Sequence, residues 1–253
     1  MTRIVLTQPR PRIERLGKRL SARGHEVLAC PMRHLVGLCE RPAVREALES
    51  VPRRDWVVFV SPGSIDACAA LLARPWPERV GIAVIGPGSA DTLAEHAITP
   101  GEGRLVRPAS PPYDAQSLLR TAPFDAPAGL DILVLAGEGG RTDWVEELAR
   151  RGALVERVAI YRSDRVAPTE EALRTLRQWA GEGAPAVFVF TTGDAVRELG
   201  DALAGAGLGR WAHAQRALAP HPRIVSMLVE RSWAGARLVE PGERALLAAI
   251  ESA

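Results

Sequence analysis

The chain has 253 residues, 47% of them hydrophobic, and a formal net charge of +2. This composition excludes a low-complexity disordered chain, and the small net charge gives no reason to expect nucleic acid as a partner. No apolar run is long enough to span a bilayer, and the N-terminus lacks the apolar core of a signal peptide. Cys30, Cys39 and Cys68 form no CxxC pair, which favours a reduced compartment over a disulfide scaffold. A cytoplasmic protein that does not contact membranes is therefore expected.

Strands and helices are predicted to alternate along the chain. Short apolar runs predict strands at 4–6, 27–30, 56–60, 81–85, 104–106, 132–135, 155–160, 186–190, 217–219 and 237–239. Amphipathic segments predict helices at 9–23, 43–50, 64–72, 89–97, 114–120, 144–151, 169–180, 194–203, 224–231 and 243–250. Residues 34–42 are predicted to be a connector and 205–210 a glycine-rich loop. This alternation is typical of α/β domains with doubly wound parallel sheets.

Parts of the chain repeat in a permuted order. The arrangement of strand, turn, helix and strand at 2–32 occurs again at 131–163, and the strand at 56–60 resembles the one at 186–190. One complete set of these units lies inside the other set, so the simplest interpretation is one domain interrupted by a second. The predicted organisation is a discontinuous domain at 1–34 and 168–253, an inserted domain at 42–161, and linkers at 35–41 and 162–167.

Candidate binding residues lie where predicted strands end, because ligands of parallel sheets bind at the carboxyl ends of the strands. Turns with glycine or hydroxyl residues occupy several of these positions. They contain Ser61, Pro62, Gly63, Gly86, Ser89, Thr191, Thr192 and Gly193. For any one hydroxyl, capping of its own helix is the alternative role.

A glycine turn with Gly137, Gly139, Gly140 and Arg141 follows the strand at 132–135. It is not a dinucleotide fingerprint, because Thr142 stands where the third glycine would be, and no GK[ST] of a phosphate-binding loop occurs. Backbone N–H groups at a helix start beside an arginine suit a carboxylate ligand instead. A tight turn with no ligand is the alternative.

The histidines show no metal-ligand spacing, and the chain contains neither HExxH nor CxxC, so no metal is expected. His221 and Arg223 follow a predicted strand and are further candidates for substrate binding, with an ordinary loop as the alternative. No serine or cysteine has the GxSxG context of a nucleophile.

Several ordered segments together resemble the uroporphyrinogen-III synthase family. They are VLTQPRP, VFVSPGSIDA, IAVIGPGSADTL, LVLAGEGGRTDWVEELARRGALVERVAIYRS, FTTGDAV and HPRI. The resemblance implies two α/β domains joined by two antiparallel linker strands, with the substrate in a cleft between them. It also adds Thr7 and Gln8 to the expected binding residues. The implied enzyme is a cofactor-free lyase of tetrapyrrole synthesis, and a monomer is expected.

The resemblance further implies the reaction. The substrate would be hydroxymethylbilane, a linear tetrapyrrole with eight carboxylates, which loses its hydroxyl as water. The last ring would then attack through its substituted carbon, form a spiro intermediate and close inverted. The resemblance places a suspected catalytic tyrosine at Tyr161, whose phenol can donate a proton while staying neutral near pH 7. An aromatic side chain packed on the linker is the alternative role.

Two positions depart from the family pattern. Gln8 and Ala136 stand where the family often has arginine, so neither position supplies the positive charge that the family pattern implies. Compensation by Arg10, Arg141 and Arg223 is a hypothesis. The alternative function is a non-catalytic two-domain protein that binds a small acidic ligand, since the same cleft would serve both.

Overall fold

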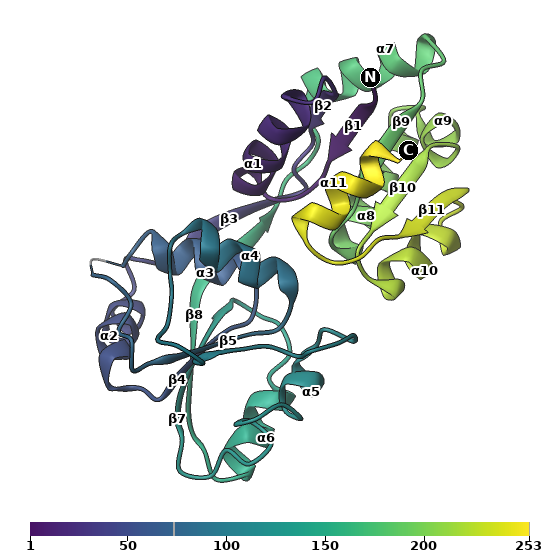
Figure 1. Ribbon diagram of the computed structural model, residues 1–253. Coiled ribbons are helices and arrows are strands. Elements are labelled where there is room, and N and C mark those ends of the chain that lie inside the picture. The colour runs from purple at the N-terminus through teal and green to yellow at the C-terminus, as the bar shows by residue number, and fades with distance from the viewer. Residues whose placement is uncertain (73, 253) are drawn as a thin grey trace. The chain divides into compact units, whose positions relative to one another are not determined.

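The computed structural model describes residues 1–72 and 74–252. The chain forms two compact units, each built around one sheet (Figure 1). Unit 1 contains Met1–His34 and Asp164–Ala253, and unit 2 contains Leu35–Ser163. The two boundaries fall within strands β3 (Arg33–Gly37) and β8 (Leu154–Arg165). In the part of the chain that the structure describes, no helix is long and apolar enough to cross a membrane.

The sheet of unit 1 is fully parallel, with the strand order β11-β10-β9-β1-β2. Its strands are β1 (Arg3–Leu6), β2 (Glu26–Ala29), β9 (Ala186–Val189), β10 (Arg216–Ala219) and β11 (Gly235–Leu238). The chain starts at β1, adds β2 on one side, and later adds β9 on the other side. The point between β1 and β9 is therefore the topological switch point, where ligands of doubly wound sheets bind.

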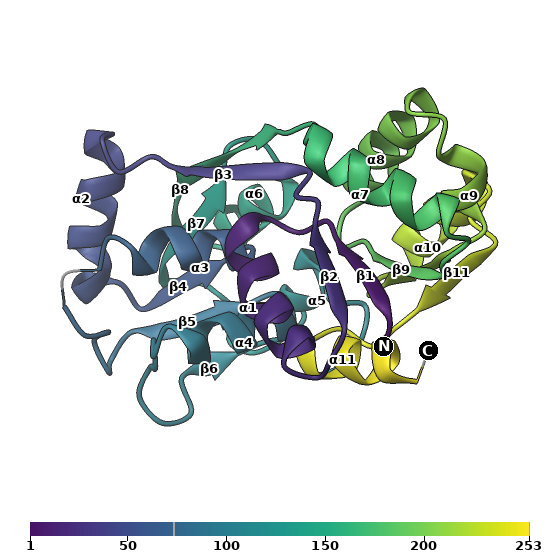
Figure 2. The same cartoon turned by 90° about the horizontal axis from the view of Figure 1, so that it is seen from above.

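Helices cover both faces of this sheet (Figures 1 and 2). They are α1 (Arg10–Ser21), α7 (Glu170–Gly181), α8 (Gly193–Gly205), α9 (Gly209–His213), α10 (Pro222–Glu230) and α11 (Glu243–Glu251). Side chains alternate between the two faces along each strand, so Ile4 and Leu6 pack with α1 and α11, whereas Val5 packs with α7, α8, α9 and α10. Both faces are hydrophobic because both are buried.

The sheet of unit 2 has the strand order β3-β8-β7-β4-β5-β6. The additional strands are β4 (Trp56–Phe59), β5 (Gly81–Val84), β6 (Leu105–Val106) and β7 (Asp131–Gly137). All neighbours are parallel except β3, which runs antiparallel to β8. The predicted fold class, α/β with two doubly wound sheets and an antiparallel pair of linking strands, is confirmed. The switch point of this sheet lies between β4 and β7.

Helices also cover both faces of the second sheet. They are α2 (Pro42–Ser50) with the 3-10 turn η1 (Val51–Arg53), α3 (Pro62–Ala69), α4 (Pro87–Glu95), α5 (Ala115–Leu118) and α6 (Asp143–Arg150). Phe59 and Leu135 pack with α2, α3 and α4, whereas Val58 and Val134 pack with α5 and α6. The site described below lies on the α3 side.

The internal repeat is visible in the strand orders. Without β3, the strand order of unit 2 is β8-β7-β4-β5-β6, which matches the order β2-β1-β9-β10-β11 of unit 1. The strand β7 therefore corresponds to β1, and β4 corresponds to β9, as the sequence comparison of 131–163 with 2–32 indicated. The hydroxyl-bearing turns after β4 and β9 accordingly occupy equivalent places in the two sheets.

A few elements differ from the sequence-based prediction. The connector predicted at 34–42 contains most of β3, and the strand predicted at 155–160 continues to Arg165. The glycine-rich loop predicted at 205–210 is shorter, because α8 extends to Gly205 and α9 begins at Gly209. In each case the polar or glycine-containing residues are held by backbone pairing or packing that local propensity does not show.

Candidate functional site

Tyr161 and Ser61 meet at the carboxyl edge of the unit 2 sheet. The hydroxyl oxygen of Tyr161 lies 2.9 Å from Oγ of Ser61. Ser61 lies two residues after the end of β4, and half-buried Tyr161 belongs to β8. The contact therefore spans the end of the strand between them, β7. This places a phenol beside the switch point, where a ligand of such a sheet is expected.

An irregularity between β7 and β8 sets the position of Tyr161. Up to Ala136, which pairs with Ala159, the two strands run in register. The register then shifts, so that Gly137 pairs with Tyr161 and not with Ile160. The N–H of Glu138 donates to the carbonyl of Tyr161 at 2.8 Å and closes the irregular segment. A bulge of this kind re-aims a side chain, a role that bulges often have beside active sites.

Two glycines make room for the phenol ring. A Cβ added to Gly137 would lie 2.7 Å from Cζ and 2.9 Å from the hydroxyl oxygen of Tyr161. A Cβ added to Gly63 would lie 3.2 Å from Cζ of Tyr161 and 2.8 Å from Cδ1 of Leu35. Gly63 and Gly137, which the sequence analysis predicts to bind substrate, leave the space that the ring of Tyr161 occupies.

Ser61 caps α3 and contacts the phenol with the same oxygen. Its Oγ accepts from the N–H of Ser64 at 3.3 Å, and the Ser64 side chain completes a capping box. Pro62 is the first residue of the helix, a favourable place for proline. The hydroxyl hydrogen of Ser61 is therefore available to the oxygen of Tyr161, and in that arrangement the proton of Tyr161 is directed elsewhere.

The glycine turn after β7 is separate from the helix that follows. Gly139 and Gly140 have φ of 73° and 79°, in the left-handed region that favours glycine. Helix α6 begins only at Asp143, so the N–H groups of the two glycines belong to the turn. Both glycines are exposed.

Arg141, the charged candidate in this turn, already has an anionic partner. Its guanidinium binds both carboxylate oxygens of Asp143, at 3.1 and 2.6 Å. Its side chain is 77% exposed. The hydrogen bonds from Arg141, together with its charge, lower the pKa of Asp143 below the ordinary value. A ligand carboxylate would therefore have to compete with Asp143 for this arginine.

Arg157 is a residue that sequence reasoning missed. It belongs to β8, and its Nη2 donates to the carbonyl oxygens of Gly137 at 3.0 Å and Gly139 at 2.6 Å. A second arginine, Arg41, pairs with Glu138 at 2.6 Å. The glycine turn is thus held by two cations from other parts of unit 2. No motif marks either residue, because both are distant from the turn in sequence.

The other predicted residues of unit 2 lie around α4. Gly86 is the N-cap residue of this helix and makes no side-chain cap. Ser89 is buried two residues into the helix, so it does not cap it. The helix predicted at 89–97 begins earlier because Pro87 suits its first position.

In unit 1, Thr7 and Gln8 follow β1 at the switch point. The hydroxyl of Thr7 donates to the carbonyl of Val189 at 2.7 Å and joins the ends of β1 and β9. Gln8 is 5% exposed, and among the described residues no donor reaches its buried Oε1. Arg10, at the start of α1, is exposed.

The remaining candidates of unit 1 also lie at helix starts. Thr192 caps α8 through Oγ1, and His221 caps α10 by accepting the N–H of Arg223 at 3.1 Å. Thr191 is half buried, and the Arg223 side chain is exposed. A Cβ added to Gly193 would lie 2.5 Å from Sδ of Met227. The structure thus brings these residues to the carboxyl ends of β9 and β10, and shows a capping role for two of them.

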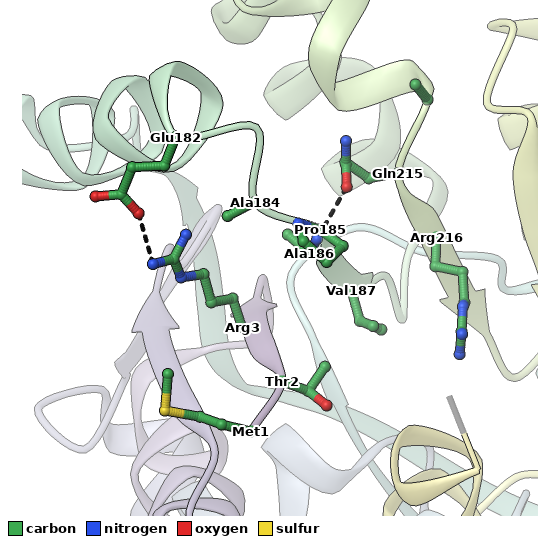
Figure 3. Close-up of a pocket in the computed structure, with 11 residues that line it drawn as sticks. Met1, Thr2, Arg3, Glu182, Ala184, Pro185, Ala186, Val187, Gln215 and Arg216 are labelled. Carbon is green, nitrogen blue, oxygen red and sulfur yellow. Dashed lines mark hydrogen bonds and ion pairs between the residues drawn. The ribbon is translucent and has the colours of Figure 1, made fainter.

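A pocket of about 670 Å³ lies at the opposite edge of the unit 1 sheet (Figure 3). It is lined by residues at the starts of β1, β9 and β10, including Arg3 and Arg216. Arg3 is paired with Glu26 and Glu182. None of the predicted binding residues lines this pocket. Within the described residues, no three His, Cys, Asp or Glu side chains are grouped as metal ligands.

Comparisons with known proteins identify the family. The model of the family described as HEM4, Uroporphyrinogen-III synthase HemD, matches residues 14–240. Uroporphyrinogen-III synthase of Salmonella typhimurium strain LT2 is 26% identical over 255 residues, which cover 98% of this chain and 99% of that protein.

Solved structures agree with the fold. The structure of a mutant uroporphyrinogen-III synthase from the extremely thermophilic bacterium Thermus thermophilus has a TM-score of 0.54 at 17% identity, covering 100% of this chain and 98% of the other. The uroporphyrinogen-III synthetase of Helicobacter pylori 26695 has a TM-score of 0.53 at 14% identity, covering 100% and 99%. The family model spans most of the chain, so the chain belongs to the uroporphyrinogen-III synthase family of hydro-lyases.

Proposed function

We propose that the chain closes hydroxymethylbilane to uroporphyrinogen III with inversion of the last ring, and that Tyr161 is its catalytic residue. The observation that carries the proposal is the contact of Tyr161 with Ser61 at the switch point of unit 2, beside the glycine turn. A phenol in this place can act on the hydroxyl that leaves the bilane, while backbone N–H groups nearby bind carboxylates of the substrate.

Tyr161 acts as the proton donor. The lone pair of the adjacent pyrrole nitrogen expels the hydroxyl, which takes a proton from Tyr161 and leaves as water. Ser61 donates to the phenolic oxygen and stabilises the negative charge that develops on it. The last ring then attacks through its substituted carbon and forms the spiro intermediate. The bond from that carbon to its original methylene breaks, the methylene bonds to the terminal carbon of the ring, and the proton that this carbon releases restores the phenol. One water leaves, and no oxidant or reductant is needed.

Carboxylate binding supplies the geometry of the reaction. The substrate also closes without enzyme to the uninverted isomer, so the enzyme must hold the chain in the conformation that leads to inversion. In unit 2 the donors are the N–H groups of Gly139 and Gly140 with Arg141. In unit 1 they are the residues after β1, β9 and β10, namely Thr7, Gln8, Thr191, Thr192, Gly193, His221 and Arg223.

Product analysis tests the proposal. The protein is supplied with hydroxymethylbilane, and the oxidised products are separated by chromatography into the inverted and uninverted porphyrin isomers. The proposal predicts mainly the inverted isomer, formed faster than spontaneous closure. Only the uninverted isomer, at the spontaneous rate, would contradict it.

A further inference from the structure

Arg157 holds the glycine turn from the neighbouring strand. Its Nη2 donates to the carbonyls of Gly137 and Gly139. The peptide between Gly137 and Glu138 is held at both of its polar groups, because the N–H of Glu138 donates to the carbonyl of Tyr161. One guanidinium therefore fixes the turn against the same strand that carries the phenol.

The contact with Gly139 decides where the next N–H points. In a trans peptide the carbonyl and the N–H point in opposite directions. The carbonyl of Gly139 faces Arg157, so the N–H of Gly140 faces away from it. Both glycines are exposed, and among the described residues no backbone or side-chain oxygen accepts from their N–H groups. The turn thus offers donors to a ligand, in a direction that Arg157 sets.

We propose that Arg157 is a positioning residue, which orders the glycine turn so that its N–H groups bind a carboxylate of the substrate. This inference rests on the function proposed above. Ordering Gly139 and Gly140, two consecutive glycines, costs conformational entropy. Hydrogen bonds from the fixed donors of a guanidinium offset that cost. The guanidinium also puts a positive charge beside the carboxylate. Ala136, buried in β7, supplies no such charge.

Three variants separate positioning from simple charge. Arg157→Met removes both the hydrogen-bond donors and the charge. Arg157→Lys keeps the charge but replaces the rigid guanidinium donors by an ammonium group on a flexible side chain. Arg53→Met is the matched control. Arg53 is exposed and precedes β4, so its loss changes the net charge equally at the amino edge of the same sheet. With hydroxymethylbilane as substrate, we expect Arg157→Met to raise KM about tenfold with kcat within about twofold of the original. The KM of Arg157→Lys should lie between those of Arg157→Met and the original protein. The KM of Arg53→Met should stay within about twofold of the original value.

A second measurement does not depend on activity. In ¹⁵N-labelled free protein, the heteronuclear NOE of Gly139 and Gly140 should drop in Arg157→Met and stay unchanged in Arg53→Met. Unchanged NOE values, or a KM equal to that of Arg53→Met, would overturn the positioning role. Failure of the original protein to make the inverted isomer would instead contradict the proposed function, while the NOE comparison would still report on the turn.

Discussion

Ser61 and Tyr161 are 100 residues apart in the chain, and their hydroxyl oxygens lie 2.9 Å apart. Three local features create this contact: the end of β4 at the cap of α3, the bulge between β7 and β8, and the absence of a side chain at Gly137. The contact turns a helix cap into part of a short chain of hydrogen bonds that ends at the phenol. Its consequences can be tested by substitution.

Ser61→Ala should lower turnover by about three- to thirtyfold, because the phenolic oxygen loses the donor that stabilises its charge. It should also cost about 1 kcal/mol of stability through the lost cap. The control is Thr169→Ala, which removes a similar cap from α7 at no candidate site. In the double variant Ser61→Ala/Tyr161→Phe, turnover should be no lower than in Tyr161→Phe alone. Additive losses in kcat would show that the two residues act independently.

Gly137→Ala should reduce turnover at least tenfold without removing any hydroxyl, since the new methyl group would lie too close to the ring of Tyr161. Gly37→Ala is a suitable control, because a Cβ at Gly37 meets nothing within 4 Å. Kinetics of both variants, with thermal unfolding to confirm that they fold, make the test. Equal activities in the two variants would mean that the position of the ring does not matter.

Arg141→Ala should raise KM about five- to tenfold if this arginine binds a substrate carboxylate, a modest effect because the pair is exposed and Asp143 competes. Removal of the competitor gives the sharper test. Asp143→Asn should lower KM in the original protein and leave it unchanged in Arg141→Ala. Arg150→Ala, at the other end of α6 and paired with Glu147, is the control. A KM for Arg141→Ala equal to that of Arg150→Ala would exclude Arg141 from the site.

The two buried thiols predict a loss of stability at alkaline pH. Burial raises the pKa of Cys30 and of Cys68 from 9.0 to about 12. Between these two pKa values the thiols stay neutral in the folded protein and ionise in the unfolded chain. Their contribution to the free energy of unfolding is therefore fully present below pH 9 and is lost as pH rises toward 12. Each thiol lowers the free energy of unfolding by about 1.4 kcal/mol per pH unit in this window.

Urea unfolding from about pH 8 to about pH 10.5 should therefore show a shallower decline in the free energy of unfolding for Cys68→Ala than for the original protein. The exposed Cys39→Ala should match the original, and identical slopes for all three would refute the effect.

The sequence predicted most of the fold because most strands of the two cores, such as β4 and β9, are short apolar runs followed by a glycine, proline or hydroxyl turn. The antiparallel strand β3 was missed from the residues alone. Its segment Arg33–Gly37 is half polar, and its pairing with β8 is a long-range contact that propensity does not encode. The permuted repeat was recognisable because the equivalent turns after β4 and β9 carry the same kinds of residue.

The sequence predicted individual residues of the candidate site but not the contacts between them. Ser61, Gly63, Gly137 and Tyr161 were each named as candidates, but the bulge that brings them together has no local signal. Arg157 was missed because its role depends on the direction of two backbone carbonyls. Whether the predicted residues bind substrate stays a prediction.

The most direct test of the account is the turnover of Tyr161→Phe. This substitution keeps the ring that packs between Gly63 and Gly137 and deletes the hydroxyl alone. The rate of formation of the inverted isomer from hydroxymethylbilane should fall by about ten- to a thousandfold, with the stability of the protein nearly unchanged. A Tyr161→Phe protein that forms the inverted isomer at the original rate would contradict the catalytic role of Tyr161.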